Sequence, residues 1–280
     1  MPKERPLVVF FPLAFLLSWY PYIIGKTHFV KTSGGMNPLG VMVAAILAAA
    51  ICYGGPGVKQ LLGRYLRWRI RPTNYILALF LPAFLVSLAA LLNLLLGAVR
   101  PTGAQLALWP EMLPRFIFIF LFIGLGEETG WRGFALPELQ KRLSPLAAGI
   151  IVGMIWATWH IPLIGIEFRG QIIPAFLLGI MSASVLGTWL FNRSEGSLLP
   201  LALFHAAVNT TGAGYVFRMF TGSDLTRLWW SFVVLWTAAA VLSVLLVPEM
   251  TAMPSDSRLM RLGQQKMCDA GGGRQQSERR

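Results

Sequence analysis

The chain has 280 residues, of which 55% are hydrophobic and only 13% are charged, and its mean hydropathy is +0.61. Soluble domains carry about 25% charged residues, so this composition excludes an ordinary soluble domain and indicates a polytopic membrane protein. A net charge of +12 is common in nucleic-acid-binding proteins, but most of the basic residues here lie between apolar segments, where they orient a membrane protein. We therefore expect the lipid bilayer as a partner and no nucleic acid.

Eight apolar segments approach the roughly 20 residues that a helix needs to cross a bilayer. They are residues 7–25, 38–54, 74–98, 113–133, 146–165, 172–191, 197–214 and 229–248. The sequence thus predicts an all-α membrane protein of about eight transmembrane helices, with one intramembrane domain over residues 1–250. The first segment is expected to be a retained helix, because no convincing small-residue cleavage site follows it. The polar residues 254–280 are predicted to form a disordered tail.

The distribution of basic residues predicts the orientation of these helices. With eight spans, both termini lie on one side, together with seventeen of the 24 lysines and arginines, and seven lie on the other side. The positive-inside rule then places both termini in the cytoplasm, in a multi-pass protein that we expect in a bacterial cytoplasmic membrane. The basic and aromatic segment 59–71 allows two interpretations: an interfacial amphipathic helix on anionic lipid, or an ordinary connection with snorkelling arginines.

Two adjacent glutamates and two histidines lie inside three of the apolar segments. They are Glu127 and Glu128 in FIGLGEETGWRGF, His160 in MIWATWHIPL and His205 in LALFHAAVN. Ionisable groups at membrane depth are costly, so they usually face a bundle interior and mark a functional site. At about 1.5 Å per residue, Glu127 and His205 are expected nearer the inner face and His160 deeper, so their convergence is a hypothesis.

Helical spacing predicts different partners for the two glutamates. Glu128 and Arg132 are four residues apart with the acid first, which is the favourable order for an ion pair. Glu127 points about 100° away from Glu128 and cannot share that arginine in the same way. The sequence therefore predicts a neutralised Glu128 and a Glu127 that is free to act.

The histidines have partners at the same spacing. His205 and Asn209 present an imidazole and a carboxamide on one helix face, because residues four apart are neighbours. Trp156 and His160 repeat this spacing, so an indole is expected to pack beside the second imidazole.

These groups suffice for hydrolysis in either of two ways. Glu127 can take a proton from a water molecule held by His160, while His205 and Asn209 donate hydrogen bonds to an oxyanion. Alternatively, Glu127, His160 and His205 can hold a zinc ion, since three protein ligands and a water are the usual catalytic set. HExxH is absent, and few acceptors beyond Thr158 and Asn209 flank the histidines, whereas zinc ligands need such partners. We favour hydrolysis without a metal, with zinc as the alternative cofactor.

Two non-enzymatic functions use similar residues. A membrane scaffold or immunity protein can keep buried polar groups for interhelical hydrogen bonds. A proton-coupled carrier also places acids and histidines within its spans, although no broken-helix repeat typical of carriers is visible.

The order of the motifs resembles the CPBP family of intramembrane proteases, which includes the type II CAAX prenyl endopeptidases and bacterial Abi-type proteins. The family's EExxxR motif matches residues 127–132, its FxxxH motif matches 156–160 and its HxxxN motif matches 205–209. Trp156 stands where the family often has Phe, a difference that bears on the shape of the cavity and on substrate fit. The similarity leaves out the first 110 or so residues and the tail.

This resemblance implies an α-helical membrane fold of about eight spans and hydrolysis of a peptide bond inside the bilayer. It implies that Glu127 activates water with His160, and that His205 and Asn209 stabilise the oxyanion. Glu128 and Arg132 are expected to support the site. Trp156 and Trp131 are expected to contact the substrate. The expected substrate is a membrane-embedded or lipidated peptide. No residue pattern in the sequence indicates that a prenyl group is recognised.

Overall fold

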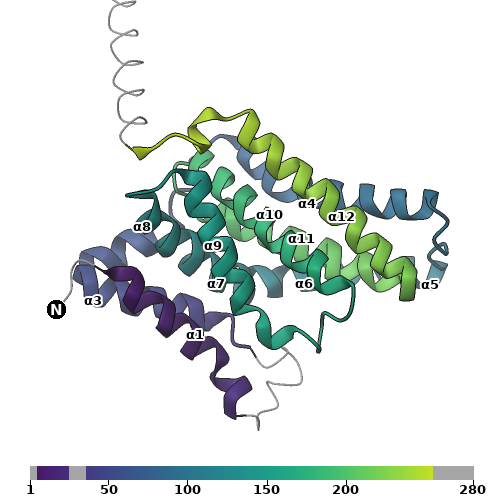
Figure 1. Cartoon of the computed structure of the whole chain (residues 1–280), viewed down its shortest axis with the longest axis horizontal. Helices are drawn as coiled ribbons and strands as arrows, with labels where there is room; N and C mark the ends of the chain where they lie inside the picture. Colours follow the sequence, from purple (N-terminus) through teal and green to yellow (C-terminus); the bar gives the residue numbers. More distant parts are fainter. Residues whose placement is uncertain (1–4, 25–35, 255–280) are drawn as a thin grey trace, which may run out of the picture.

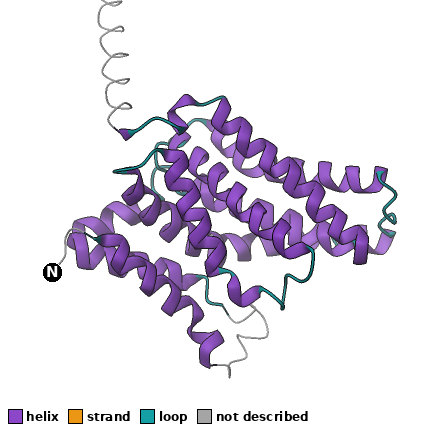
Figure 2. Cartoon of the chain, in the orientation of Figure 1, coloured by secondary structure: helices purple, strands orange, loops and turns teal. Residues whose placement is uncertain are grey.

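The protein is almost entirely helical (Figure 2). The computed structural model describes residues 5–24 and 36–254, and within these ranges the one β-type contact is an isolated bridge between Ile164 and Phe168. This confirms the predicted all-α fold. Apart from Pro254, the predicted disordered tail lies outside the described residues.

The described helices follow one another along the chain with short connections. The α-helices are α1 (Pro6–Ile24), α3 (Leu39–Gly63), α4 (Pro72–Leu95), α5 (Gly103–Leu106), α6 (Met112–Phe118), α7 (Leu125–Gly130), α8 (Leu136–Gln140), α9 (Pro145–Trp159), α10 (Ile172–Arg193), α11 (Leu199–Thr211) and α12 (Gly222–Leu245). Short 3₁₀ and π segments join them: η1 (Trp109–Glu111), η2 (Ile119–Gly124), η3 (Trp131–Ala135), η4 (Ile161–Leu163), η5 (Gly212–Val216), η6 (Phe217–Met219) and η7 (Pro248–Met250).

Five described helical stretches are long and apolar enough to cross a membrane. They are α3, α4, the stretch Gly103–Gln140, α10 and α12. Shorter apolar helices cover Pro6–Pro21 and Pro145–Trp159, and α11 has 13 residues before it continues into η5. The chain is therefore an all-α polytopic membrane protein. Each of the eight expected segments contains a helix, but a count of eight full crossings stays a prediction.

Small residues bring these helices close together. On α3, four alanines spaced along one face are buried, and α3 packs between α1 and α7 (Figure 1). Close packing of small residues is the usual way in which membrane helices associate. On the other side of the bundle, α10 packs against both α9 and α12, and α11 packs against α4.

The basic segment 59–71 is only partly helical. Its first five residues complete α3, which continues past the kink at Gly54 to Gly63, and the remainder forms turns and irregular backbone. Arg64 donates a hydrogen bond to the carbonyl of Gly196, and Arg67 donates one to that of Glu195. The segment is thus a connection anchored to the loop between α10 and α11, which favours the second of the two interpretations over an amphipathic surface helix.

Candidate active site

The helix α7 carries both motif glutamates and lies between two π-helical segments, η2 and η3. Glu127 and Glu128 are each 3% exposed, so both carboxyls are withdrawn from the surface. Tyr65, in the turn that follows α3, holds the start of this helix: its hydroxyl donates to the carbonyl of Leu125 and is 2.9 Å from the Thr129 hydroxyl. Burial raises the pKa of the Tyr65 phenol, which keeps its hydrogen-bonding proton in place.

Glu128 is the centre of a buried charge cluster. Its Oε1 accepts a hydrogen bond of 3.1 Å from Nη1 of Arg132, and the same oxygen is 2.8 Å from Nδ1 of His205. All three residues are buried. The ion pair predicted between Glu128 and Arg132 is confirmed, and the contact with His205 was not predicted. A carboxylate has no proton to give, so Nδ1 of His205 donates here.

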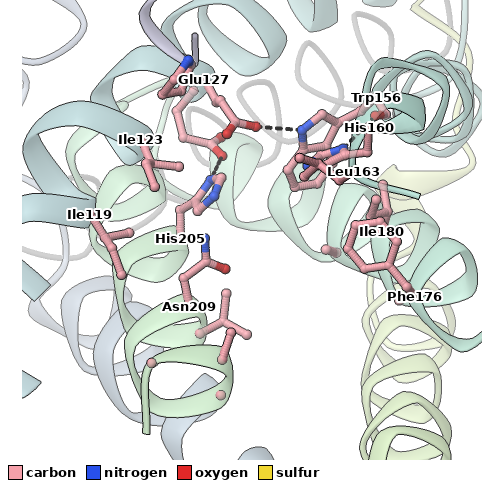
Figure 3. A pocket seen from close by; sticks show the side chains of 18 of the residues that line it. Ile119, Ile123, Glu127, Trp156, His160, Leu163, Phe176, Ile180, His205 and Asn209 are labelled. Atoms are coloured by element: carbon pink, nitrogen blue, oxygen red, sulfur yellow. Dashed lines mark hydrogen bonds and ion pairs between the residues drawn. The ribbon is translucent and has the colours of Figure 1, made fainter. Parts of the chain in front are cut away.

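Glu127 faces a different partner. Its Oε2 accepts a hydrogen bond of 2.6 Å from the indole Nε1 of Trp156, on α9 (Figure 3). The guanidinium of Arg132 lies over the same indole, 4.3 Å from its ring centre, which is a cation–π arrangement. Trp156 therefore links the two glutamates: it bonds one directly and packs against the cation that bonds the other.

His160 lies at the point where α9 ends. Ser144 begins this helix by accepting a hydrogen bond from the backbone NH of Ala147, and His160 is the first residue after its last turn. Its Nδ1 is 2.8 Å from the backbone carbonyl of Trp156. A carbonyl only accepts, so Nδ1 carries a proton, and in the neutral ring Nε2 has the lone pair. The rings of Trp156 and His160 are 5.6 Å apart, as the spacing of four residues predicted.

One cavity of about 600 Å³ brings the predicted residues together. Glu127 from α7, His160 from the end of α9, and His205 and Asn209 from α11 all line it, with Glu128, Arg132 and Trp156 (Figure 3). His205 and Asn209 follow one another on the same wall. Most of the other lining side chains are apolar or aromatic, so this small polar group lies in a hydrophobic cavity, as is usual in ligand-binding sites.

Trp131 does not line this cavity. It is fully buried, and its ring packs edge-on against Phe10 and Trp159, with ring centres 5.7 and 6.1 Å apart. The expected substrate contact by Trp131 is therefore not supported, because the side chain points into the interface of α1 with α9. Trp156, the other residue expected to contact substrate, does line the cavity.

Two charged residues that line the cavity were not predicted from the sequence. Arg115 on α6 and Glu167 in the loop between α9 and α10 both face the cavity. Arg115 also forms an ion pair of 2.9 Å with Glu111. Their position near the ends of apolar segments is the one signal that could have identified them, and it is shared by most arginines of the chain.

The surroundings of the two histidines bear on the zinc alternative in two ways. Both histidines have the acceptors that the sequence did not reveal, namely the Trp156 carbonyl and the Glu128 carboxylate, so that argument against zinc was wrong. However, within residues 5–24 and 36–254 no three His, Cys, Asp or Glu side chains are arranged to hold a metal ion. Glu127, His160 and His205 do not fit a three-ligand site in this geometry.

The fold and this cavity define an integral membrane protein with acidic, imidazole and amide groups gathered between its helices. Residues 108–211, which contain all three motifs, match the family described as type II CAAX prenyl endopeptidase Rce1-like. This match confirms the resemblance over that segment.

A curated relative shows the same similarity. The chain is 31% identical over 102 residues to the CAAX prenyl protease 2 of Methanococcus maripaludis, a match that covers 33% of this chain and 38% of that protein. Little more than a third of the length of that relative is thus matched by this chain.

Proposed function

We propose that the protein is an intramembrane endopeptidase that hydrolyses a peptide bond of a membrane-embedded or lipidated peptide. The observation that carries this proposal is the common cavity of Glu127, His160, His205 and Asn209. The match of residues 108–211 to a prenyl endopeptidase family supports it, as does the named activity of the relative from Methanococcus maripaludis.

Glu127 is the general base of the proposed reaction. Oε2 is occupied by the indole of Trp156, which leaves Oε1 to accept a proton from water. The free lone pair on Nε2 of His160 accepts the second hydrogen bond of the same water and orients it. The hydroxide so formed attacks the carbonyl carbon, and the protonated Glu127 then gives its proton to the nitrogen of the leaving amine as the C–N bond breaks.

His205 and Asn209 stabilise the oxyanion of the tetrahedral intermediate. Nδ1 of His205 is committed to Glu128, so Nε2 is the nitrogen that is left for substrate, and it donates when the ring is protonated. The Asn209 amide supplies a second donor from the next turn of α11. Removing one such donor commonly lowers kcat about 10²–10³-fold.

The test compares Glu127→Gln with Glu249→Gln, a matched change at an exposed glutamate of η7. The purified variants are offered two fluorogenic peptides, one with a hydrophobic anchor and one farnesylated near its C-terminus. We expect Glu127→Gln to abolish cleavage with a nearly unchanged Tm, and Glu249→Gln to keep full activity. Full activity of Glu127→Gln would remove Glu127 as the base.

The same variants separate the two non-enzymatic alternatives. A scaffold or immunity protein would cleave neither peptide, and folded Glu127→Gln would keep its function in cells. A proton-coupled carrier would also leave both peptides intact, but it would move protons across proteoliposomes, and Glu127→Gln would stop that movement.

A further inference from the structure

Arg115 is a cationic side chain of the cavity that the proposed reaction does not use. Among the described residues that line the cavity, the arginines are Arg115 and Arg132. The side chain of Arg132 is 2% exposed and is paired with Glu128, whereas that of Arg115 is 38% exposed. A guanidinium that lines a largely apolar cavity and still reaches solvent is available to an anionic group of a ligand.

The hydrogen-bonding capacity of Arg115 is only partly used. Within the described residues its guanidinium makes one hydrogen bond, of 2.9 Å, from Nη2 to Oε2 of Glu111. Its Nε is shielded from solvent and has no hydrogen-bond partner among the described residues, although buried polar groups are nearly always paired. The N–H groups of Nε and Nη1 therefore remain for a ligand, and a guanidinium suits the two oxygens of a carboxylate.

The charge of Arg115 is not fully balanced by Glu111. The same Oε2 of Glu111 also lies 3.9 Å from Nη1 of Arg218, so two arginines share one carboxylate. Glu111 is 51% exposed and does not line the cavity. Exposed ion pairs contribute little to stability, so this pair does not prevent Arg115 from binding a second carboxylate inside the cavity.

Arg115 lies on the wall that carries the two residues of the proposed oxyanion site. A Cβ on Gly214 would lie 3.0 Å from Cδ of Arg115 and 3.2 Å from the carbonyl oxygen of Asn209. The arginine side chain thus packs on the turn that follows Asn209, and His205 precedes Asn209 on the same wall (Figure 3). A peptide that passes His205 and Asn209 in this direction arrives at Arg115.

Two facing helical stretches give the length of this path. Arg115 precedes Glu127 by twelve positions, which is about 18 Å at a rise of about 1.5 Å per residue. On the facing stretch, His205 contacts Glu128 and precedes Gly214 by nine positions, which is about 14 Å by the same rise. An extended peptide covers about 3.3–3.6 Å per residue, so the path corresponds to about four to five residues.

Resting on the proposed peptidase activity, we propose that Arg115 is a specificity-determining residue that binds a carboxylate of the substrate, about four to five residues beyond the scissile bond. The carboxylate belongs to a free C-terminus or to an acidic side chain at that place, since both have the same chemistry. Ile119 and Ile123 line the cavity between Arg115 and Glu127, so the substrate residues that connect the scissile bond to the carboxylate are apolar.

Three peptides of one sequence with a hydrophobic anchor test this role. They end about four residues beyond the scissile bond in a free carboxylate, in a C-terminal amide, or in an amidated glutamate. We expect the wild type to have a KM about tenfold lower for the free carboxylate than for the amide, as a hydrogen-bonded charge commonly contributes. The amidated glutamate distinguishes the two sources: a low KM for it identifies an acidic side chain as sufficient, and a high KM identifies the C-terminus.

Arg115→Gln should raise KM for the carboxylate peptide to that of the amide peptide. Arg218→Gln is the matched control and should keep the preference, because Arg218 contacts the same Glu111 but does not line the cavity. An equal loss of cleavage of both peptides in Arg115→Gln would indicate a merely structural role and would overturn the proposal. Lengthening the peptide one residue at a time should weaken the preference, and an unchanged preference at every length would also overturn it.

Binding measurements separate this proposal from the peptidase activity. Fluorescence anisotropy of the labelled peptides is measured in detergent with Glu127→Gln and with the double variant that adds Arg115→Gln. We expect tighter binding of the carboxylate peptide to the single variant and equal binding of both peptides to the double variant. Equal binding of both peptides to Glu127→Gln would overturn the role of Arg115, and cleavage by the wild type would still support the peptidase. If the wild type cleaves no peptide but binding depends on Arg115, the peptidase proposal is contradicted and the carboxylate site stands.

Discussion

The indole Nε1 of Trp156 donates a 2.6 Å hydrogen bond to Oε2 of Glu127. The two residues are 29 positions apart in the chain and belong to α9 and α7. An indole NH can only donate, so this bond fixes one carboxyl oxygen of the proposed base and leaves the other for water. The side chain that fixes the base is also the one that packs under Arg132.

We predict that Trp156→Phe lowers kcat/KM while the protein stays folded. Phenylalanine keeps an aromatic ring for Arg132 and His160 but removes the donor to Glu127. A hydrogen bond to a charged group contributes about 1.5–3 kcal/mol, which corresponds to a loss of roughly tenfold or more in kcat/KM. Trp159→Phe is the matched control, since the indole Nε1 of Trp159 has no hydrogen-bond partner among the described residues. Equal activity of wild type and Trp156→Phe would show that the bond is dispensable.

Glu128→Gln is expected to reduce stability more than Glu127→Gln does. The change leaves the buried Arg132 and His205 without their shared carboxylate, and breaking a buried ion pair costs about 3–5 kcal/mol. Glu138→Gln serves as the control, because its partner Lys141 is 57% exposed and exposed pairs contribute about 0–1 kcal/mol. Thermal unfolding in detergent measures all three variants. Equal Tm values for Glu128→Gln and Glu138→Gln would contradict the central position of Glu128.

Gly187→Ala should impair catalysis through Arg132. A Cβ at Gly187 would lie 3.2 Å from Nε of Arg132, so the guanidinium would have to move away from α10. Small displacements of groups that position a catalytic site commonly lower rates by about tenfold to a hundredfold. Gly63→Ala adds the same methyl group where no described atom outside its own stretch of helix lies within 4 Å, and it should leave activity unchanged. If both variants keep wild-type kcat/KM, the placement of Arg132 does not limit the reaction.

Removal of metal ions should leave cleavage intact. This expectation follows from the lack of a three-ligand arrangement among the described His, Cys, Asp and Glu side chains, and from a mechanism that Glu127 and His160 complete with water. The measurement is activity before and after chelation, together with metal analysis of the same samples. Stoichiometric zinc, with activity lost on chelation and restored by zinc, would contradict it.

The sequence predicted those contacts that depend on a single helix. The ion pair of Glu128 with Arg132 and the packing of Trp156 on His160 both follow from a spacing of four residues, and both are present. The same spacing predicted His205 and Asn209 on one helix face, and both line the cavity.

Contacts between helices could not be read in the same way. The depth estimate separated His160 from Glu127, because it assumed regular helices of known length. In fact α9 ends at Trp159, so His160 lies in a turn, and π-helical segments flank α7. Trp131 was expected to contact the substrate, but its ring packs against Phe10 and it does not line the cavity.

The glycines around the two glutamates restrict how the cavity can change shape. A Cβ on Gly124 would lie 2.9 Å from the Ala202 carbonyl oxygen, and one on Gly126 would lie 2.8 Å from that of Pro38. The end of η2 and the start of α7 are thus packed closely against the backbone of their neighbours, and this stretch cannot move outward without breaking that packing. A peptide that is wider than the cavity has to be admitted by movement of the opposite wall, at the loop 161–171 and the start of α10. We therefore expect the proposed base to stay in place while the substrate binds.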